Sequence, residues 1–314
     1  MQAAPKSEME MPIRAAVFGN ATLDVICKTV DEVPRYESIA FEDVVVSPGG
    51  CGSNVAIGLA AQSVQTLLIA RVGQDDAGRL VQSYWRRARI DLSCLQLDPE
   101  KPTAVSVGLV DSQAQPRFIH TPGANGNLTA ADLDIDFLLQ SRVKWLHIAG
   151  FFVLPGILDG LIAEKLKLAQ QAGMGISLDV VRSPRMRHPE YVWPCLPYLD
   201  VFLCNAEESR MLTGKTNPVE AARDLLEYGG KRVIVKLGQE GCLLAGQEEQ
   251  EHIPGVPVEV VDTTGAGDAF AAGLIAALIK GADLPAACLA ANLAGAQNAA
   301  CFGALGNWLP SIPL

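Results

Sequence analysis

The stretch Val258–Gly273, which reads VEVVDTTGAGDAFAAG, constrains the fold more than any other part of the chain. Its first half is rich in β-branched residues as a strand is, two glycines follow within three residues, and its second half is an alanine-rich helix start. We therefore predict that a strand turns sharply into a helix here. The N–H groups of Gly265, Ala266 and Gly267 would then lie unpaired at the helix N-terminus, where the helix dipole favours a bound anion.

An acidic residue, Asp268, occupies the first turn of the same predicted helix. A carboxylate beside an anion site is electrostatically unfavourable, so its position requires a reason. One explanation is a general base that takes a proton from a nucleophile attacking a bound phosphate. The alternative is that the glycines serve tight packing and that Asp268 only complements the helix dipole, because a glycine pattern alone is weak evidence of a site.

Length and composition fit one large α/β domain or two smaller ones, because the chain has 314 residues, 49% of them apolar and 19% charged. The formal net charge of −10 argues against nucleic-acid and membrane-surface partners. The eight cysteines form no CxxC pair, which indicates reduced thiols in the cytoplasm rather than zinc ligands or disulfides. Residues 1–12 have no apolar core and are predicted to be a disordered leader before one domain, 13–314.

Apolar strand-like runs alternate with helical segments along nearly the whole chain, which predicts a mostly parallel sheet with helices on both faces, a three-layer α/β/α domain. The expected strands are residues 14–19, 64–73, 143–149, 174–181, 199–204 and 232–237. Two further segments, about 33–46 and 103–120, alternate apolar and polar residues. They predict a small inserted sheet that could lie over the ligand site as a lid.

Ligands of parallel α/β sheets bind at the carboxyl ends of the strands. Asp24 comes just after the first expected strand and is a candidate for binding substrate hydroxyls, with a turn or capping role as the alternative. The segment PGGCGSN, residues 48–54, opens a helix. Its Gly50 would let main chain approach a small polar ligand, and Asn54 can hydrogen-bond hydroxyl groups; the alternative is a helix start that only packs.

Three other polar positions have two interpretations each. Asn205 and Glu208 follow the strand 199–204 and can share a hydrated Mg²⁺, or they can cap a helix. Arg117, in the expected lid, could reach a substrate phosphate or carboxylate, or it could only add solubility. His147 lies within an apolar strand and is predicted to be a core residue rather than a catalyst.

The motifs resemble those of the ribokinase-like, pfkB-type carbohydrate kinases over roughly residues 13–310. The likeness rests on PGGCGSN in the N-terminal third and DTTGAGDAFAAG near the C-terminus, with NAEE and KLGQEG between them in the same order. The C-terminal motif is highly specific, and the others are moderate alone but strong in series. The resemblance implies the ribokinase-like fold, with a lid that often also forms the contact of a homodimer.

The resemblance also implies roles for individual residues. Asp268 is similar to the family's catalytic base, and the N–H groups of Ala266, Gly267 and Asp268 resemble its anion hole for the γ-phosphoryl group of ATP. The family's sugar-binding positions match Asp24, Gly50 and Asn54, and its positions for Mg²⁺ and phosphate match Asn205 and Glu208. Its nucleotide-side positions match Lys236, Gly238, Gly241 and Thr264. Asp262, together with Thr264, matches positions that in many members hold a monovalent cation such as K⁺.

Departures from the family pattern leave the substrate open. Ribokinases usually have Asn at the position of Thr22 and Lys at that of Cys51, and many ketoacid-sugar kinases have Asp-x-Asn-x-Arg where this chain has DVVR, residues 179–182. We therefore predict an ATP- and Mg²⁺-dependent kinase acting on a hydroxyl of a sugar or sugar-like molecule. The alternatives are a nucleoside kinase, which an aromatic pocket using Phe151 and Phe152 would favour, and a non-catalytic sugar sensor, against which the intact glycine turn argues.

Overall fold

The structure, a computed structural model, describes residues 14–113, 116–306 and 308. The predicted leader, 1–12, lies outside the described residues. The main body is built on an eight-stranded sheet with the strand order β14-β13-β12-β11-β10-β9-β1-β4. Its strands are β1 (Arg14–Gly19), β4 (Gln65–Ile69), β9 (Val143–Ala149), β10 (Gly175–Asp179), β11 (Val201–Asn205), β12 (Arg232–Lys236), β13 (Gly241–Gly246) and β14 (Gln250–Pro254).

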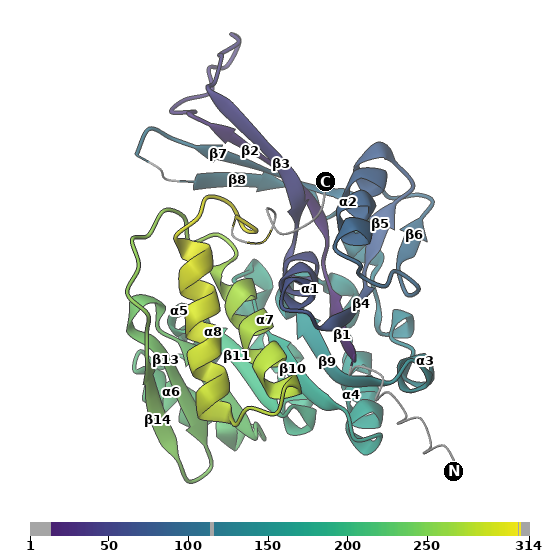
Figure 1. Ribbon diagram of the computed structural model, residues 1–314, viewed down its shortest axis with the longest axis vertical. Helices are drawn as coiled ribbons and strands as arrows, with labels where there is room; N and C mark the ends of the chain where they lie inside the picture. The colour runs from purple at the N-terminus through teal and green to yellow at the C-terminus, as the bar shows by residue number, and fades with distance from the viewer. Residues whose placement is uncertain (1–13, 114–115, 307, 309–314) are drawn as a thin grey trace, which may run out of the picture.

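The sheet is parallel from β4 to β12, and only β13 and β14 pair antiparallel at one edge. The sheet has a separate hydrophobic core on each of its two faces. One face is covered by α1 (Cys51–Ala61), α2 (Asp76–Arg87), α7 (Ala266–Ile279) and α8 (Leu284–Ala299). The second core includes α3 (Ile135–Gln140), α4 (Leu161–Gln171), α5 (Ala206–Thr213) and α6 (Pro218–Glu227). The prediction of a three-layer, mostly parallel α/β/α fold is therefore confirmed (Figure 1).

Helices α7 and α8 are formed by alanine-rich sequence near the C-terminus and pack side by side on the sheet (Figure 1). Eight consecutive residues of α7, from Ala269 to Ala276, are buried, as expected for a helix that is apolar on all sides and is covered on all sides.

Among the helices of the described residues, none is long and apolar enough to cross a membrane.

A second, four-stranded sheet projects from the main body (Figure 1). Its order is β3-β2-β7-β8, formed by β2 (Thr22–Lys28), β3 (Asp43–Gly49), β7 (Ala104–Val110) and β8 (Pro116–His120). The predicted strand at 33–46 starts too early, because 33–42 is an exposed segment without strand structure. Asp24 follows the first strand as expected, but it lies within β2, so the alternative of a turn or capping residue was wrong. Short β5 (Arg71–Gly73) and β6 (Gln96–Asp98) form a separate pair.

The chain crosses between the two sheets at four places, and these crossings are hydrogen-bonded to one another. The Asn125 side chain, which follows β8, binds both the N–H and the C=O of Ala21, which precedes β2. Two further bonds link the remaining crossings: Cys51 N to Asn20 Oδ1 at 3.1 Å, and Ala124 N to Pro102 O at 2.8 Å. All four crossings therefore meet at one junction.

The prediction of a strand over the first half of Val258–Gly273 was wrong. Residues 255–260 carry no strand structure and are mostly exposed. The next residues are held by the end of α8 instead of a sheet, since the N–H groups of Val261 and Asp262 both donate to Ala299 O, at 2.8 and 3.1 Å. The β-branched side chains of this segment instead line a pocket.

Gly52 in α1 packs directly against Gly19 at the end of β1. A Cβ atom at position 52 would lie 2.6 Å from the carbonyl carbon of Gly19. We expect Gly52→Ala to lower the free energy of unfolding by about 1–2 kcal/mol, because overpacking costs about 1–3 kcal/mol and the gain in helix propensity is only about 1 kcal/mol. Urea unfolding measures this, with Gly126→Ala as the control, since a Cβ there meets nothing within 4 Å. Equal or greater stability of Gly52→Ala would contradict this account.

Candidate active site

Asp268 lies in the first turn of α7, where it meets α1. Asn54 Nδ2 donates to Asp268 Oδ2 at 2.7 Å, and the Cys51 thiol lies near the same carboxyl. Burial raises the pKa of Asp268 to about 6, and the charge of Asp179 adds to the rise, while Asn54, Lys236 and Cys51 oppose it. A carboxyl with this pKa is ionised at neutral pH and is basic enough to accept a proton.

The N-terminus of α7 begins at Gly265, whose φ of 74° is in the left-handed region. A Cβ atom there would lie 2.5 Å from Ala304 O, so glycine is required both by conformation and by space. Ala266 N donates to Thr263 O at 3.2 Å. Within the described ranges, the N–H groups of Gly267 and Asp268 have no acceptor, so these two form the open part of the predicted anion hole.

The Lys236 ammonium group lies beside this helix start, from the carboxyl end of β12. A Cβ atom on Gly267 would be 3.1 Å from Lys236 Nζ. Burial alone would lower the pKa of Lys236, but Glu208, Asp179 and Asp268 outweigh it and raise the pKa. The ammonium group is therefore charged, and the negative charges of three carboxylates from three different elements stabilise it.

Asp24, the predicted substrate-binding residue, lies with its carboxylate directly against Gly49. Thr22 Oγ1 donates to Asp24 Oδ1 at 2.6 Å, while burial raises the pKa of the carboxyl. Because Gly49 directly precedes Gly50, the N-cap of α1, Asp24 lies at the helix end that carries Cys51. The structure thus brings Asp24 and Gly50 to the same end of the sheet as Asp268.

Asn205 and Glu208 form a reciprocal capping box at the start of α5. Glu208 N donates to Asn205 Oδ1 at 2.8 Å, and Asn205 N donates to Glu208 Oε2 at 2.7 Å. Burial raises the pKa of Glu208, against the opposing charge of Lys236. In the part of the chain that the structure describes, no three His, Cys, Asp or Glu side chains are placed to hold a metal ion. This arrangement fits Mg²⁺ held mainly by phosphate oxygens and water, with Asn205 and Glu208 around it.

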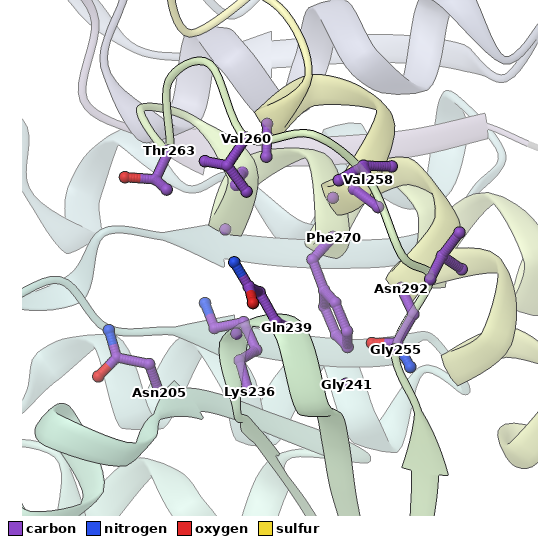
Figure 2. Close-up of a pocket in the computed structure, with 17 residues that line it drawn as sticks. Asn205, Lys236, Gln239, Gly241, Gly255, Val258, Val260, Thr263, Phe270 and Asn292 are labelled. Atoms are coloured by element: carbon purple, nitrogen blue, oxygen red, sulfur yellow. The ribbon is translucent and has the colours of Figure 1, made fainter. Parts of the chain in front are cut away.

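A cleft of about 300 Å³ opens beside the anion hole (Figure 2). Its polar end has Lys236, Asn205 and Thr263, and its apolar wall has Val258, Val260 and Phe270. Further lining residues, among them the predicted Gly238, Gly241, Ala266 and Gly267, connect this cleft to the N-terminus of α7. The cleft therefore joins the open N-terminus of α7 to a space with an apolar wall.

Two predicted positions lie elsewhere. Arg117 is turned to the chain after β2, where its guanidinium donates to the C=O groups of Val30 and Asp31 at 2.7 and 3.0 Å. Asp262 accepts from Thr264 N at 2.9 Å and Gly303 N at 3.0 Å.

Thr264 C=O in turn accepts from Asn298 Nδ2 at 2.9 Å, so Asp262 and Thr264 organise a loop beside the cleft. Among the residues that line the cleft, Thr263 rather than Thr264 supplies the threonine.

Sequence reasoning did not assign Cys51, Asp179 or Asn125 to the site. Cys51 and Asp179 were noted only as departures from a motif, although their positions, one in a glycine-rich helix start and one at the end of a strand, are the signal for ligand-side residues. Asn125 had no such signal, because its role depends on Ala21, more than 100 residues away in the chain.

A buried carboxyl in the first turn of a helix, beside open backbone N–H groups and a lysine, at the carboxyl end of a parallel sheet and next to a small inserted sheet, is the arrangement expected of a small-molecule kinase. The model of the pfkB family of carbohydrate kinases matches residues 13–311. The chain belongs to this family and is therefore a carbohydrate kinase, an enzyme that transfers a phosphoryl group from ATP to a sugar.

Individual relatives agree. A fructokinase of Klebsiella pneumoniae is 30% identical over 80% of this chain and 83% of its own length, and an aminoimidazole riboside kinase of Salmonella typhimurium is 27% identical over 88% of each. Among solved structures, Arabidopsis thaliana ribokinase complexed with ribose and ATP has a TM-score of 0.81 at 25% identity, covering 96% of both chains. The sensor alternative is thereby set aside.

Proposed function

We propose that the protein phosphorylates a hydroxyl group of a free sugar, with Asp268 as the base that accepts the hydroxyl proton. One observation carries the proposal: Asn54 is 4% exposed, its Nδ2 is bound to Asp268, and its buried Oδ1 has no partner among the described residues. A buried acceptor without a donor is costly, and a substrate hydroxyl would satisfy it. That hydroxyl would then lie next to the Asp268 carboxylate.

The anion hole and Lys236 are proposed to hold the transferring phosphoryl group. The open N–H groups of Gly267 and Asp268 and the charged Lys236 ammonium group supply positive potential at one point. Phosphoryl transfer needs such positioning and charge stabilisation more than covalent help from the protein. The apolar wall at Val258, Val260 and Phe270 is proposed to hold the base of ATP, as supported by the ATP complex of the Arabidopsis ribokinase.

Mg²⁺ is proposed to bind near Asn205 and Glu208. When bound, the ion would neutralise phosphate charge and orient the γ-phosphoryl group. The Glu208 carboxylate is buried, and burial raises its pKa despite the opposing charge of Lys236, so additional positive charge near it would be favourable. The protein's own part is to fix the orientation of Glu208 through the capping box with Asn205.

A sugar is favoured over a nucleoside. Phe151 and Phe152, the aromatic residues that could have stacked on a nucleobase, are both 0% exposed and pack edge to face, with ring centroids 5.1 Å apart. They belong to the core on the far side of the sheet from α7. The relationship to an aminoimidazole riboside kinase keeps a nucleoside as the second candidate.

A substrate panel tests the proposal. Free sugars, sugar phosphates, sugar acids and nucleosides are compared by ADP formation with ATP and Mg²⁺, with and without K⁺. We expect turnover on a free hexose or pentose with the highest kcat/KM. Higher kcat/KM on a nucleoside would replace the sugar as substrate, and no turnover on any compound would contradict the proposal.

A monovalent cation is proposed to bind beside Asp262 and Thr264. Asn298 lies at this loop with its Oδ1 buried and unpartnered among the described residues, so a neutral oxygen ligand is present. We expect K⁺ to raise kcat in the panel, and equal rates in K⁺ and in tetramethylammonium would contradict this part of the proposal.

The pH profile provides a further prediction. A base must be ionised, so kcat/KM should fall as the pH drops through the pKa of Asp268, about 6, and be constant above it. Initial rates between pH 5 and 8.5 at low sugar concentration measure this limb. A rate that stays constant down to pH 5 would contradict the assignment of Asp268 as the base.

The four-stranded sheet is proposed to act as a lid and as the contact of a homodimer. Its apolar exposure supports the dimer, since Ile119 of β8 is 66% and Val44 of β3 47% exposed. We expect sedimentation to give a dimer that Ile119→Asp weakens, whereas a monomeric wild type would contradict it.

A cytoplasmic location is proposed from the eight free thiols.

A further inference from the structure

A line of buried polar side chains runs across the sheet beneath the active site, from β9 to β10. Trp145 Nε1 donates to Ser177 Oγ at 2.8 Å, Ser177 Oγ lies 2.9 Å from His147 Nδ1, and His147 Nε2 lies 3.4 Å from Asp179 Oδ2. Ser177 and His147 are 0% exposed and Asp179 is 2% exposed. The residues face the same side because His147 is in register with Ser177 on a parallel neighbour.

The hydrogen-bond chemistry gives this line a direction. The indole N–H can only donate, so Ser177 Oγ is the acceptor there and its own proton is available to His147 Nδ1. The remaining ring nitrogen, Nε2, then carries a proton that points to Asp179. Within the described ranges, Nε2 makes no hydrogen bond, and Asp179 Oδ2, at 3.4 Å, is the carboxylate oxygen that it faces.

Asp179 ends this line at the carboxyl end of β10, next to the proposed catalytic groups. Its other oxygen accepts from Gly150 N at 2.5 Å. The charged or titratable groups that face it from the surrounding elements are His147 of β9, Lys236 of β12, Asp268 of α7, Glu208 of α5 and Cys51 of α1. Burial alone would raise the pKa of Asp179, but His147, Lys236 and Gly150 N–H outweigh burial and lower it.

We propose that His147 and Asp179 are positioning residues that keep a second negative charge beneath Asp268 and so set the pH range in which Asp268 accepts the substrate proton. Two like charges held close together cannot both ionise easily, so an ionised Asp179 makes Asp268 a stronger base. His147 contributes through its Nε2, which faces Asp179 Oδ2 at 3.4 Å and favours the ionised carboxylate despite its burial. The proposal rests on the base role of Asp268 proposed above.

The first test replaces Asp179 by Asn. The amide oxygen can still accept from Gly150 N–H, so the variant removes charge with little change of shape. We expect the acid limb of kcat/KM to move to lower pH by about half a unit or more, because Asp268 loses a neighbouring negative charge. Asp200→Asn is the matched control, since Asp200 lies at the opposite end of the neighbouring strands, where it accepts from Ile176 N at 2.9 Å. Its acid limb should stay at the wild-type position.

The second test separates His147 from simple packing. His147→Leu removes the ring N–H, so Asp179 should be protonated more readily. The acid limb of kcat/KM should therefore again move to lower pH. His147→Gln keeps an N–H donor and should restore most of the wild-type profile. Loss of thermal stability without any movement of the limb in Asp179→Asn and His147→Leu would overturn the proposal and leave only a structural role.

A direct titration distinguishes failure of this proposal from failure of the base assignment. In protein labelled with ¹³C at aspartate carboxyls, the Asp268 signal is the one that is missing in Asp268→Asn. We expect its midpoint to fall in Asp179→Asn whether or not Asp268 is the base. A midpoint equal to that of the wild type overturns the coupling, and a shifted midpoint without a shifted rate profile overturns the base assignment instead.

Discussion

Replacing Asp268 by Asn is expected to lower kcat by about 10²–10⁴-fold, the usual contribution of a positioned general base. The amide keeps the size of the side chain and can still meet Asn54, but it cannot take a proton. The fold should survive: ionisation of Asp268 disfavours the folded state as the pH rises from 3.8 to about 6, so a neutral residue should not lower Tm at pH 8. ADP formation and thermal unfolding measure the two effects.

A matched control is Asp76→Asn, which removes a carboxylate from the first turn of another helix, α2, where the side chain is 97% exposed. Its kcat should equal that of the wild type. ATP binding, followed by fluorescence titration or calorimetry, should be kept in Asp268→Asn. If Asp268→Asn turned over the true substrate at nearly the wild-type rate, the base would have to be another group.

The second large effect is expected from Lys236→Met, which should lower kcat by about 10²–10³-fold. Methionine has about the length of lysine but no charge, so the phosphoryl group loses the ammonium group beside Gly267. The variant should also have a lower Tm, because the buried carboxylates Asp179, Glu208 and Asp268 lose a neighbouring positive charge. Rates are therefore compared at a temperature well below the Tm of the variant.

Lys231→Met is the control for Lys236→Met. Lys231 directly precedes the same strand, β12, but its ammonium group is exposed and pairs with Asp200 at 2.9 Å. A surface ion pair contributes little to stability, so this variant should have wild-type kcat and nearly wild-type Tm. A Lys236→Met enzyme with unchanged kcat and a raised KM for ATP would place Lys236 on the nucleotide alone.

The layers of the fold and the identity of the glycine turn could be predicted because both are local in sequence. Alternating runs of strand and helix residues predict a parallel sheet, and Gly265 with Asp268 lies within a single short motif. The strand predicted at Val258 failed for a non-local reason: the apolar segment is bound by the end of α8 and not by a sheet edge. The strand β2 was missed because Asp24 interrupts its apolar pattern.

The charge pattern of the site could not be read from the sequence. Lys236 was predicted on the nucleotide side, but its closeness to Asp179, Glu208 and Asp268 depends on the order of β10, β11 and β12 in the sheet and on where α7 packs. Each of these residues has an ordinary local interpretation as a strand end or a helix cap. Only the sheet order and the packing of the helices bring them together.

The junction of the four chain crossings has a mechanical consequence for the proposed lid. The Asn125 side chain is hydrogen-bonded to both the N–H and the C=O of Ala21. The strand that carries Asp24 is therefore held in place where it leaves the main body. A sheet attached at one junction can rotate about it as about a hinge, and the end far from the hinge moves most. Asp24 is three residues from Ala21, so it would stay near Asp268 while the distal hairpins of the lid move away and open the site.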